Sequence, residues 1–96
     1  MADYRLSNKA DDDLAGIFTY SFQNFGEAKA RAYLLSLHEC LSLLAEQPAI
    51  GRKIDHIRQG YLRHEHVSHA ICYKIRDDGI LVVRVLHQSM KSEFHL

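Results

Sequence analysis

The chain has 96 residues, of which 47% are hydrophobic and 25% charged, and its formal net charge at pH 7 is zero. This length and composition predict a single globular domain over residues 1–96. No apolar run approaches the ~20 residues of a membrane span, and the first residues lack a signal-peptide core, which excludes the membrane class and predicts a cytoplasmic protein. The cysteines, Cys40 and Cys72, lack metal or redox spacing, so we expect two buried free thiols.

Residues 4–6 are a short strand candidate that leads directly into a helix. Ser7 or Asn8 can cap this helix, and three aspartates, Asp11 to Asp13, place negative charge near its positive N-terminal end. Gly26 then interrupts the helical pattern, and a second helix follows that ends before Pro48. The apolar positions that repeat at helical spacing are Ala10, Leu14, Ile17, Phe18 and Phe25 in the first helix, and Ala30, Tyr33, Leu34, Leu37, Leu41 and Leu44 in the second. Two helices joined by so short a break predict an antiparallel hairpin.

Residues 48–60 form one long connection, after which the apolar period changes to two. Strands are predicted at 61–66 and 67–75, the latter with one apolar face that contains Tyr73. Asp77-Asp78-Gly79 predicts a hairpin turn, and residues 80–86 form a nearly continuous apolar strand that should be covered on both faces. The predicted fold is therefore α+β, with an N-terminal strand and an antiparallel helical hairpin packed on a C-terminal antiparallel three-stranded meander.

Charge is unevenly distributed along the chain. Residues 1–48 carry four Lys/Arg and seven Asp/Glu, a balance of −3, whereas residues 49–96 carry eight and five, a balance of +3. Six of the seven histidines also lie in the second half. This asymmetry predicts one cationic face, but the excess is far below that of a typical nucleic-acid binder, so we expect contact with DNA only through a partner.

Arg84 is the most unusual residue of the sequence because it lies within the apolar strand Ile80–Leu86. A guanidinium in such a setting is costly to desolvate unless it is paired or faces an open groove. Two interpretations remain open at this point. Arg84 either recognises a partner or forms an ion pair with a carboxylate of the hairpin, for example Glu39 or Glu46.

A series of residues in fixed order carries a resemblance to a known family. The series comprises Ala10, Leu14, Phe25-Gly26, Pro48 to Arg52, Asp55, Ile57 to Tyr61, Arg63, Ser68-His69, Tyr73 and Arg84 to Met90. It resembles the ParE toxins of the RelE/ParE superfamily, and the resemblance covers essentially the whole chain. It implies the toxin of a type II toxin–antitoxin system that inhibits DNA gyrase by binding, without catalytic residues or a cofactor. It also implies a hetero-oligomer with a ParD-type antitoxin that neutralises the toxin.

Two surfaces follow from this resemblance and from the residue pattern. For contact with gyrase we predict Arg58, Tyr61, Arg63, Arg84, His87 and Met90, together with the segment 88–96. For contact with the antitoxin we predict Leu14, Phe18, Leu37, Leu41 and Phe94. The antitoxin has two available modes of docking, an amphipathic helix on the apolar face between the helical hairpin and the sheet, and a strand added at a sheet edge, either residues 4–6 or residues 61–66.

Two alternative functions remain. RelE-like members of the superfamily cut mRNA on the ribosome, and His69 and His87 are candidates for an acid/base pair. However, His69 stands where those enzymes carry an arginine, and the C-terminal segment has no tyrosine, so we favour a toxin that is not an enzyme. The other alternative is a non-toxic member that only binds its antitoxin.

Histidines at 64, 66 and 69 also suggest a metal site. On a strand, His64 and His66 point to the same face, whereas the adjacent Glu65 points to the opposite one. Neither a second carboxylate nor a cysteine lies at ligand spacing. We therefore predict no metal site.

Overall fold

One five-stranded sheet, in the order β1-β5-β4-β3-β2, forms the centre of the computed structural model, which describes residues Ala2–Leu96. The elements are β1 (Asp3–Leu6), α1 (Asn8–Phe25), α2 (Glu27–Glu46), a 3₁₀ turn (Pro48–Ile50), β2 (Arg52–Lys53), β3 (Tyr61–His66), β4 (His69–Arg76), β5 (Gly79–His87) and a second 3₁₀ turn (Ser92–Phe94). β3, β4 and β5 form the predicted antiparallel meander, and β1 adds to β5 in the parallel direction. The α+β fold is thus confirmed, although the two-residue strand β2 was not predicted.

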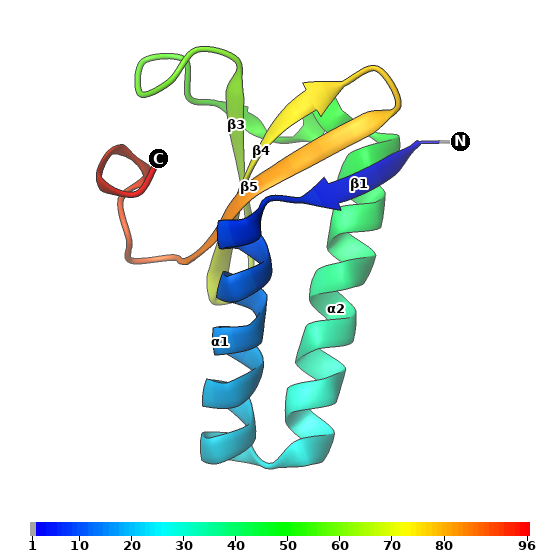
Figure 1. Ribbon diagram of the computed structural model, residues 1–96, viewed down its shortest axis with the longest axis vertical. Coiled ribbons are helices and arrows are strands. Elements are labelled where there is room, and N and C mark those ends of the chain that lie inside the picture. Colours follow the sequence, from blue (N-terminus) through cyan, green and yellow to red (C-terminus); the bar gives the residue numbers. More distant parts are fainter. Residues whose placement is uncertain (1) are drawn as a thin grey trace.

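The helical hairpin forms as predicted because a capping residue marks the start of α1 and a glycine separates the two helices. The Ser7 side chain caps α1 by accepting a hydrogen bond from the backbone N–H of Ala10 at 3.0 Å. Gly26 links the helices with a φ of 88°, a conformation that favours glycine. Figure 1 shows the two helices side by side, with the Gly26 end of the hairpin projecting well beyond the sheet.

This projection leaves the last part of the apolar pattern of α1 uncovered. Phe25 belongs to the apolar pattern of α1, but its side chain is 59% exposed because the sheet does not reach the tip of the hairpin. Tyr20 and Phe22, on the same end of α1, are also exposed. The apolar residues that fill the core lie nearer the sheet, and those with almost no exposed surface include Leu37, Leu41, Leu44, Ile71, Tyr73, Ile80 and Val82.

The first hairpin of the meander differs from the prediction in where its second strand begins, whereas the second hairpin has its turn where it was predicted. The strand predicted over 67–75 begins at His69, because Val67 and Ser68 form the β3–β4 turn and Val67 has a φ of 51°. At the next turn Gly79 has a φ of 148°, and a side chain there would collide with the backbone carbonyl of Asp3 in β1. Glycine at this position therefore allows β1 to lie directly beside β5.

The central part of β4 is buried on both faces, contrary to the prediction of one apolar face. Ala70 to Tyr73 are each fully inaccessible. Ile71 and Tyr73 belong to the core under the helices, while the alternate residues Ala70 and Cys72 point the other way. Cys40 and Cys72 are both buried and free, as predicted. Within Ala2–Leu96, none of the helices combines the length and hydropathy needed to cross a membrane.

Candidate functional site

The sheet face opposite the helical hairpin carries two arginines on either side of a cysteine. The strand register aligns Arg63 of β3 with Cys72 of β4, and Cys72 with Arg84 of β5. Directly opposed residues of antiparallel strands point to the same face of a sheet. The two guanidinium groups therefore lie on one surface, separated by the small Cys72 side chain.

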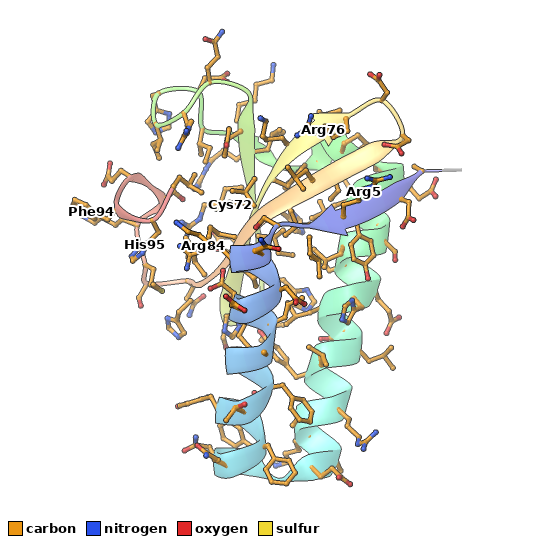
Figure 2. All side chains as sticks on the ribbon, in the orientation of Figure 1. Arg5, Cys72, Arg76, Arg84, Phe94 and His95 are labelled. Carbon is orange, nitrogen blue, oxygen red and sulfur yellow. The ribbon has the colours of Figure 1, made fainter. Side chains whose placement is uncertain are left out.

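The C-terminal tail, defined here as residues 88–96, folds back over this surface and is held by both arginines. Arg63 donates from Nη2 to the Gln88 carbonyl at 3.2 Å, and from Nη1 to the Met90 carbonyl at 3.1 Å and the Ser92 hydroxyl at 2.7 Å. Arg84 donates from Nη1 to the His95 carbonyl at 3.1 Å. Figure 2 shows Arg84 between Cys72 and the turn of the tail that carries Phe94 and His95. The tail is thus fixed in one shape by four hydrogen bonds from the sheet.

Arg84 also forms the shortest ion pair of the described residues. Its Nε and Nη2 donate to the two carboxylate oxygens of Asp13 at 2.8 and 3.0 Å, and both side chains are only 17% exposed. The same carboxylate accepts the backbone N–H of Val85 at 3.0 Å. Hydrogen bonding to Asp13 raises the pKa of Arg84. The predicted ion pair therefore exists, but Glu39 and Glu46 were the wrong partners.

The remaining residues predicted to contact gyrase occupy two other places. The Arg58 guanidinium and the Lys74 ammonium lie 5.5 and 5.3 Å from the centre of the Tyr61 ring, at the edge of the same sheet face. Met90 is part of the tail, and Arg63 is only 8% exposed beneath it. His87 belongs to the opposite face of the sheet, where its ring lies 5.7 Å from that of His69.

The residues predicted to contact the antitoxin divide into three groups. Leu37 and Leu41 are core residues without accessible surface, and Leu14 is nearly so. Phe94 lies on the tail and is 77% exposed. Phe18 lines an apolar groove between α1, α2 and β1, whose other lining residues are Leu6, Asp11, Leu14, Ala15, Arg31, Leu34, Leu35 and His38. Leu35 was missed because it lies one position off the apolar stripe of α2.

The two sheet edges differ in their availability for an added strand. β1 is an edge strand, as predicted for residues 4–6. The edge of β3 is partly occupied, because Arg52 and Lys53 of β2 pair with Arg63 and Leu62. The candidate edge at residues 61–66 is therefore free only in part.

A cluster of histidines joins the sheet to α2 at the β3–β4 turn. The Tyr33 hydroxyl lies 2.6 Å from His69 Nδ1, and the Ser36 hydroxyl lies 3.0 Å from His66 Nε2. Burial, together with the charges of neighbouring histidines, lowers the pKa of both His66 and His69. Across Ala2–Leu96, no three residues of the His, Cys, Asp or Glu type are grouped as metal ligands.

Comparison with known proteins gives one consistent family. The model of the family "ParE toxin of type II toxin-antitoxin system, parDE" matches residues 4–92. The chain is 38% identical to Toxin ParE1 of Caulobacter vibrioides over 96 residues, covering 100% of this chain and 99% of that protein. It is 36% identical to Toxin ParE1 of Mycobacterium tuberculosis over 94 residues, covering 97% and 96% of the two chains. Among solved structures, a chain of the chromosomal ParDE system from P. aeruginosa has the same fold, with a TM-score of 0.75, 19% identity and coverage of 91% and 96%.

Proposed function

Because this chain belongs to the ParE toxin family of type II toxin–antitoxin systems, we propose that it inhibits DNA gyrase by binding and that a ParD-type antitoxin neutralises it. In this proposal the toxin acts without catalysis and without a cofactor. Inhibition then depends on a surface that is already shaped before the target arrives, because a preformed surface loses little conformational entropy on binding.

The observation that carries the proposal is the exposure of Phe94 on a tail that is hydrogen-bonded to the sheet. The phenyl ring is 77% exposed although the tail around it makes four hydrogen bonds to Arg63 and Arg84. Exposed aromatic side chains on ordered backbone are frequent anchors of protein interfaces. We therefore assign the tail, with Phe94 at its centre, to the contact with gyrase, although Phe94 was predicted from the sequence to contact the antitoxin.

Five of the six predicted target residues take part in this proposal, in two roles. Arg63 and Arg84 hold the tail in its shape, since their donors are used by Asp13 and by tail oxygens. The more accessible residues on the side of the tail contact gyrase directly, namely Arg58, Tyr61 and Met90, whereas His87 lies on the opposite face of the sheet and is left out of this contact. A cationic residue such as Arg58 favours association with an acidic surface.

For the antitoxin we propose the apolar groove as the docking site of an amphipathic helix. Its lining by Phe18, Leu34 and Leu35 supplies apolar contacts on both helices of the hairpin. The exposed edge of β1 borders the groove through Leu6 and is suited to accept an added strand. Stable neutralisation requires a buried area above ~1,000 Å², which such a two-part contact can supply.

The role of the tail can be tested with two phenylalanine variants. Phe94→Ala should weaken inhibition of purified gyrase in a supercoiling assay by at least tenfold, because it removes the anchor. Phe25→Ala is the matched control, since Phe25 is also strongly exposed but lies at the tip of the hairpin. Equal inhibition by both variants and the unmodified toxin would remove the tail from the proposed target surface.

One arrangement keeps mRNA cleavage as a second candidate. His69 and His87 lie with their ring centres 5.7 Å apart, and Tyr33 is hydrogen-bonded to His69. Two neighbouring imidazoles can in principle share the acid and base steps of RNA cleavage. A ribosome-dependent mRNA cleavage assay beside the gyrase assay separates the two functions, and inactivity in both would favour a member that only binds its antitoxin.

A further inference from the structure

The sheet face that carries the tail continues beyond it as a surface of basic side chains. The register aligns Arg5 of β1 with Leu81 of β5, Leu81 with Lys74 of β4, and Lys74 with Tyr61 of β3. These residues therefore share one face of the sheet. Arg76 lies two residues after Lys74 and points the same way. Figure 2 labels Arg5 and Arg76 at the same end of the sheet.

Further cations border this row. Arg52 of β2 is aligned with Arg63 and so belongs to the same face, and Arg58 lies against the Tyr61 ring. We use the term basic face for the five residues Arg5, Arg52, Arg58, Lys74 and Arg76. In the part of the chain that the structure describes, the ion pairs are Arg31–Glu27, Arg63–Glu65 and Arg84–Asp13. None of the five residues has a carboxylate partner.

Five acidic residues border this face, and they are Asp3, Asp55, Glu65, Asp77 and Asp78; of these, Glu65 of β3 is paired with Arg63. Asp3 precedes Arg5 by two positions, and its carboxylate accepts the backbone N–H of Tyr4 at 2.7 Å. Asp77 and Asp78 form the β4–β5 turn at the end of the sheet, and Asp55 accepts the Gly60 N–H in the loop before β3. The middle of the face, between β1 and β3, carries only cations, Leu81 and Tyr61.

The composition of the face indicates the chemistry of its partner. Protein interfaces have an apolar centre from which charged residues, and lysine in particular, are depleted. Here the centre is Lys74, whereas the apolar surface suited to a protein partner is the groove on the helical hairpin. Nucleic-acid interfaces are instead polar and positively charged, because the ligand presents regularly spaced phosphates.

We propose that the basic face binds the phosphodiester backbone of DNA directly, which replaces the expectation from net charge that DNA is contacted only through a partner. The five cations contact phosphates, and Tyr61 is held between Arg58 and Lys74 at the border of the contact. The inference goes beyond the proposed inhibition of gyrase, since it concerns the toxin and DNA alone. Because the net charge of the chain is zero, its affinity for DNA depends on the concentration of positive side chains on this face.

The test is the salt dependence of DNA binding by the refolded toxin, measured by fluorescence anisotropy with a short labelled duplex and without gyrase. Five phosphate contacts predict that log K falls against log salt with a slope of about −4. The triple variant R5A/K74A/R76A should bind more than tenfold more weakly and reduce that slope by roughly three. The control K9A/K29A/R31A removes the same charge from exposed positions of the two helices and should bind like the unmodified toxin.

Each other outcome overturns the proposal. Absence of salt-dependent binding by the unmodified toxin would exclude direct contact with DNA, while leaving inhibition of gyrase untouched. If the control variant lost as much affinity for DNA as the triple variant, the net charge of the protein, and not this face, would determine binding. Unchanged DNA binding by R5A/K74A/R76A together with weaker binding to gyrase or antitoxin would make the face a protein interface. Urea denaturation of all three proteins verifies that each is folded.

Discussion

Asp13 and Arg84, 71 positions apart in the chain, form a bidentate ion pair that connects α1 to β5 at distances of 2.8 and 3.0 Å. The same guanidinium donates to the tail at His95, and the same carboxylate accepts the backbone N–H of Val85. One pair thus joins the hairpin, the sheet and the tail. Loss of this pair should therefore weaken the contacts among all three parts.

The first prediction concerns this pair. Asp13→Ala should lower the free energy of unfolding by about 2–3 kcal/mol, because it leaves a largely buried guanidinium and a backbone N–H without their acceptor. The neighbouring Asp12→Ala changes an exposed side chain of the same helix and should stay within about 0.5 kcal/mol. Urea denaturation followed by circular dichroism measures both. Similar values for the two variants would show that the pair contributes little.

The second prediction concerns the buried hydroxyl of Tyr73. It donates to the Pro48 carbonyl at 2.6 Å and accepts the Gly51 N–H at 3.0 Å. Tyr73→Phe leaves both backbone groups unpaired and should cost about 1–3 kcal/mol. Tyr20→Phe is the control because Tyr20 is exposed, and it should leave the urea midpoint unchanged. A Tyr73→Phe midpoint equal to that of the unmodified protein would contradict the assigned role.

The third prediction concerns acid sensitivity. The folded-state pKa values of His66 and His69 lie below the ordinary 6.5, chiefly through burial. The unfolded chain therefore binds more protons in this range, so stability should fall as pH drops below 6.5. Tyr33, His64 and His87 surround the pair, and none of them supplies a negative charge near neutral pH.

A double variant tests this acid sensitivity. His66→Gln with His69→Asn retains a polar atom near each hydrogen-bond partner but cannot be protonated. Thermal unfolding at a series of pH values should show a flatter acid limb for this variant, whereas His56→Gln, in the exposed loop before β3, should keep the original slope. An unchanged acid limb in the double variant would assign the effect to other groups.

The fourth prediction concerns the proposed antitoxin groove. Leu35→Glu should weaken binding of the antitoxin at least tenfold without loss of stability, because Leu35 lines the groove yet is 61% exposed. Leu43→Glu is the matched control, an exposed leucine of the same helix outside the groove-lining residues. Isothermal titration with the antitoxin measures both. If Leu43→Glu is the more damaging change, the groove is not the docking site.

The sequence predicted those parts of the fold that have a strong local pattern. Helical spacing, the Ser7 cap and Gly26 determine the hairpin, and alternation indicates the meander. β2 has only two residues, which is too few to show a periodic pattern. The strand β4 was predicted to begin at Val67 because β-branched residues favour strands and are uncommon at the positive φ that Val67 adopts in the turn. Local periodicity also does not reveal how far the sheet reaches, so it could not indicate that Phe25 is exposed.

The site was harder to predict because it depends on contacts between distant segments. The apolar context of Arg84 indicated an ion pair, but its partner follows from where α1 begins relative to β5. The negative charge of Asp13 was already explained by its position near the positive N-terminal end of the helix, and so Asp13 was not considered as the partner of Arg84. The burial of Arg63 could not be predicted for the same reason. It depends on contact with the tail, whose sequence has no helical or strand periodicity.

The most direct test of the account is DNA supercoiling by purified gyrase in the presence of the refolded toxin, with a ribosome-dependent mRNA cleavage assay beside it. We expect supercoiling to stop as toxin is added, DNA cleavage by gyrase to be trapped, mRNA to stay intact, and activity to return when a ParD-type antitoxin is supplied. Undiminished supercoiling at excess folded toxin would contradict the central claim. Cleaved mRNA in the same experiment would then direct attention to His69 and His87.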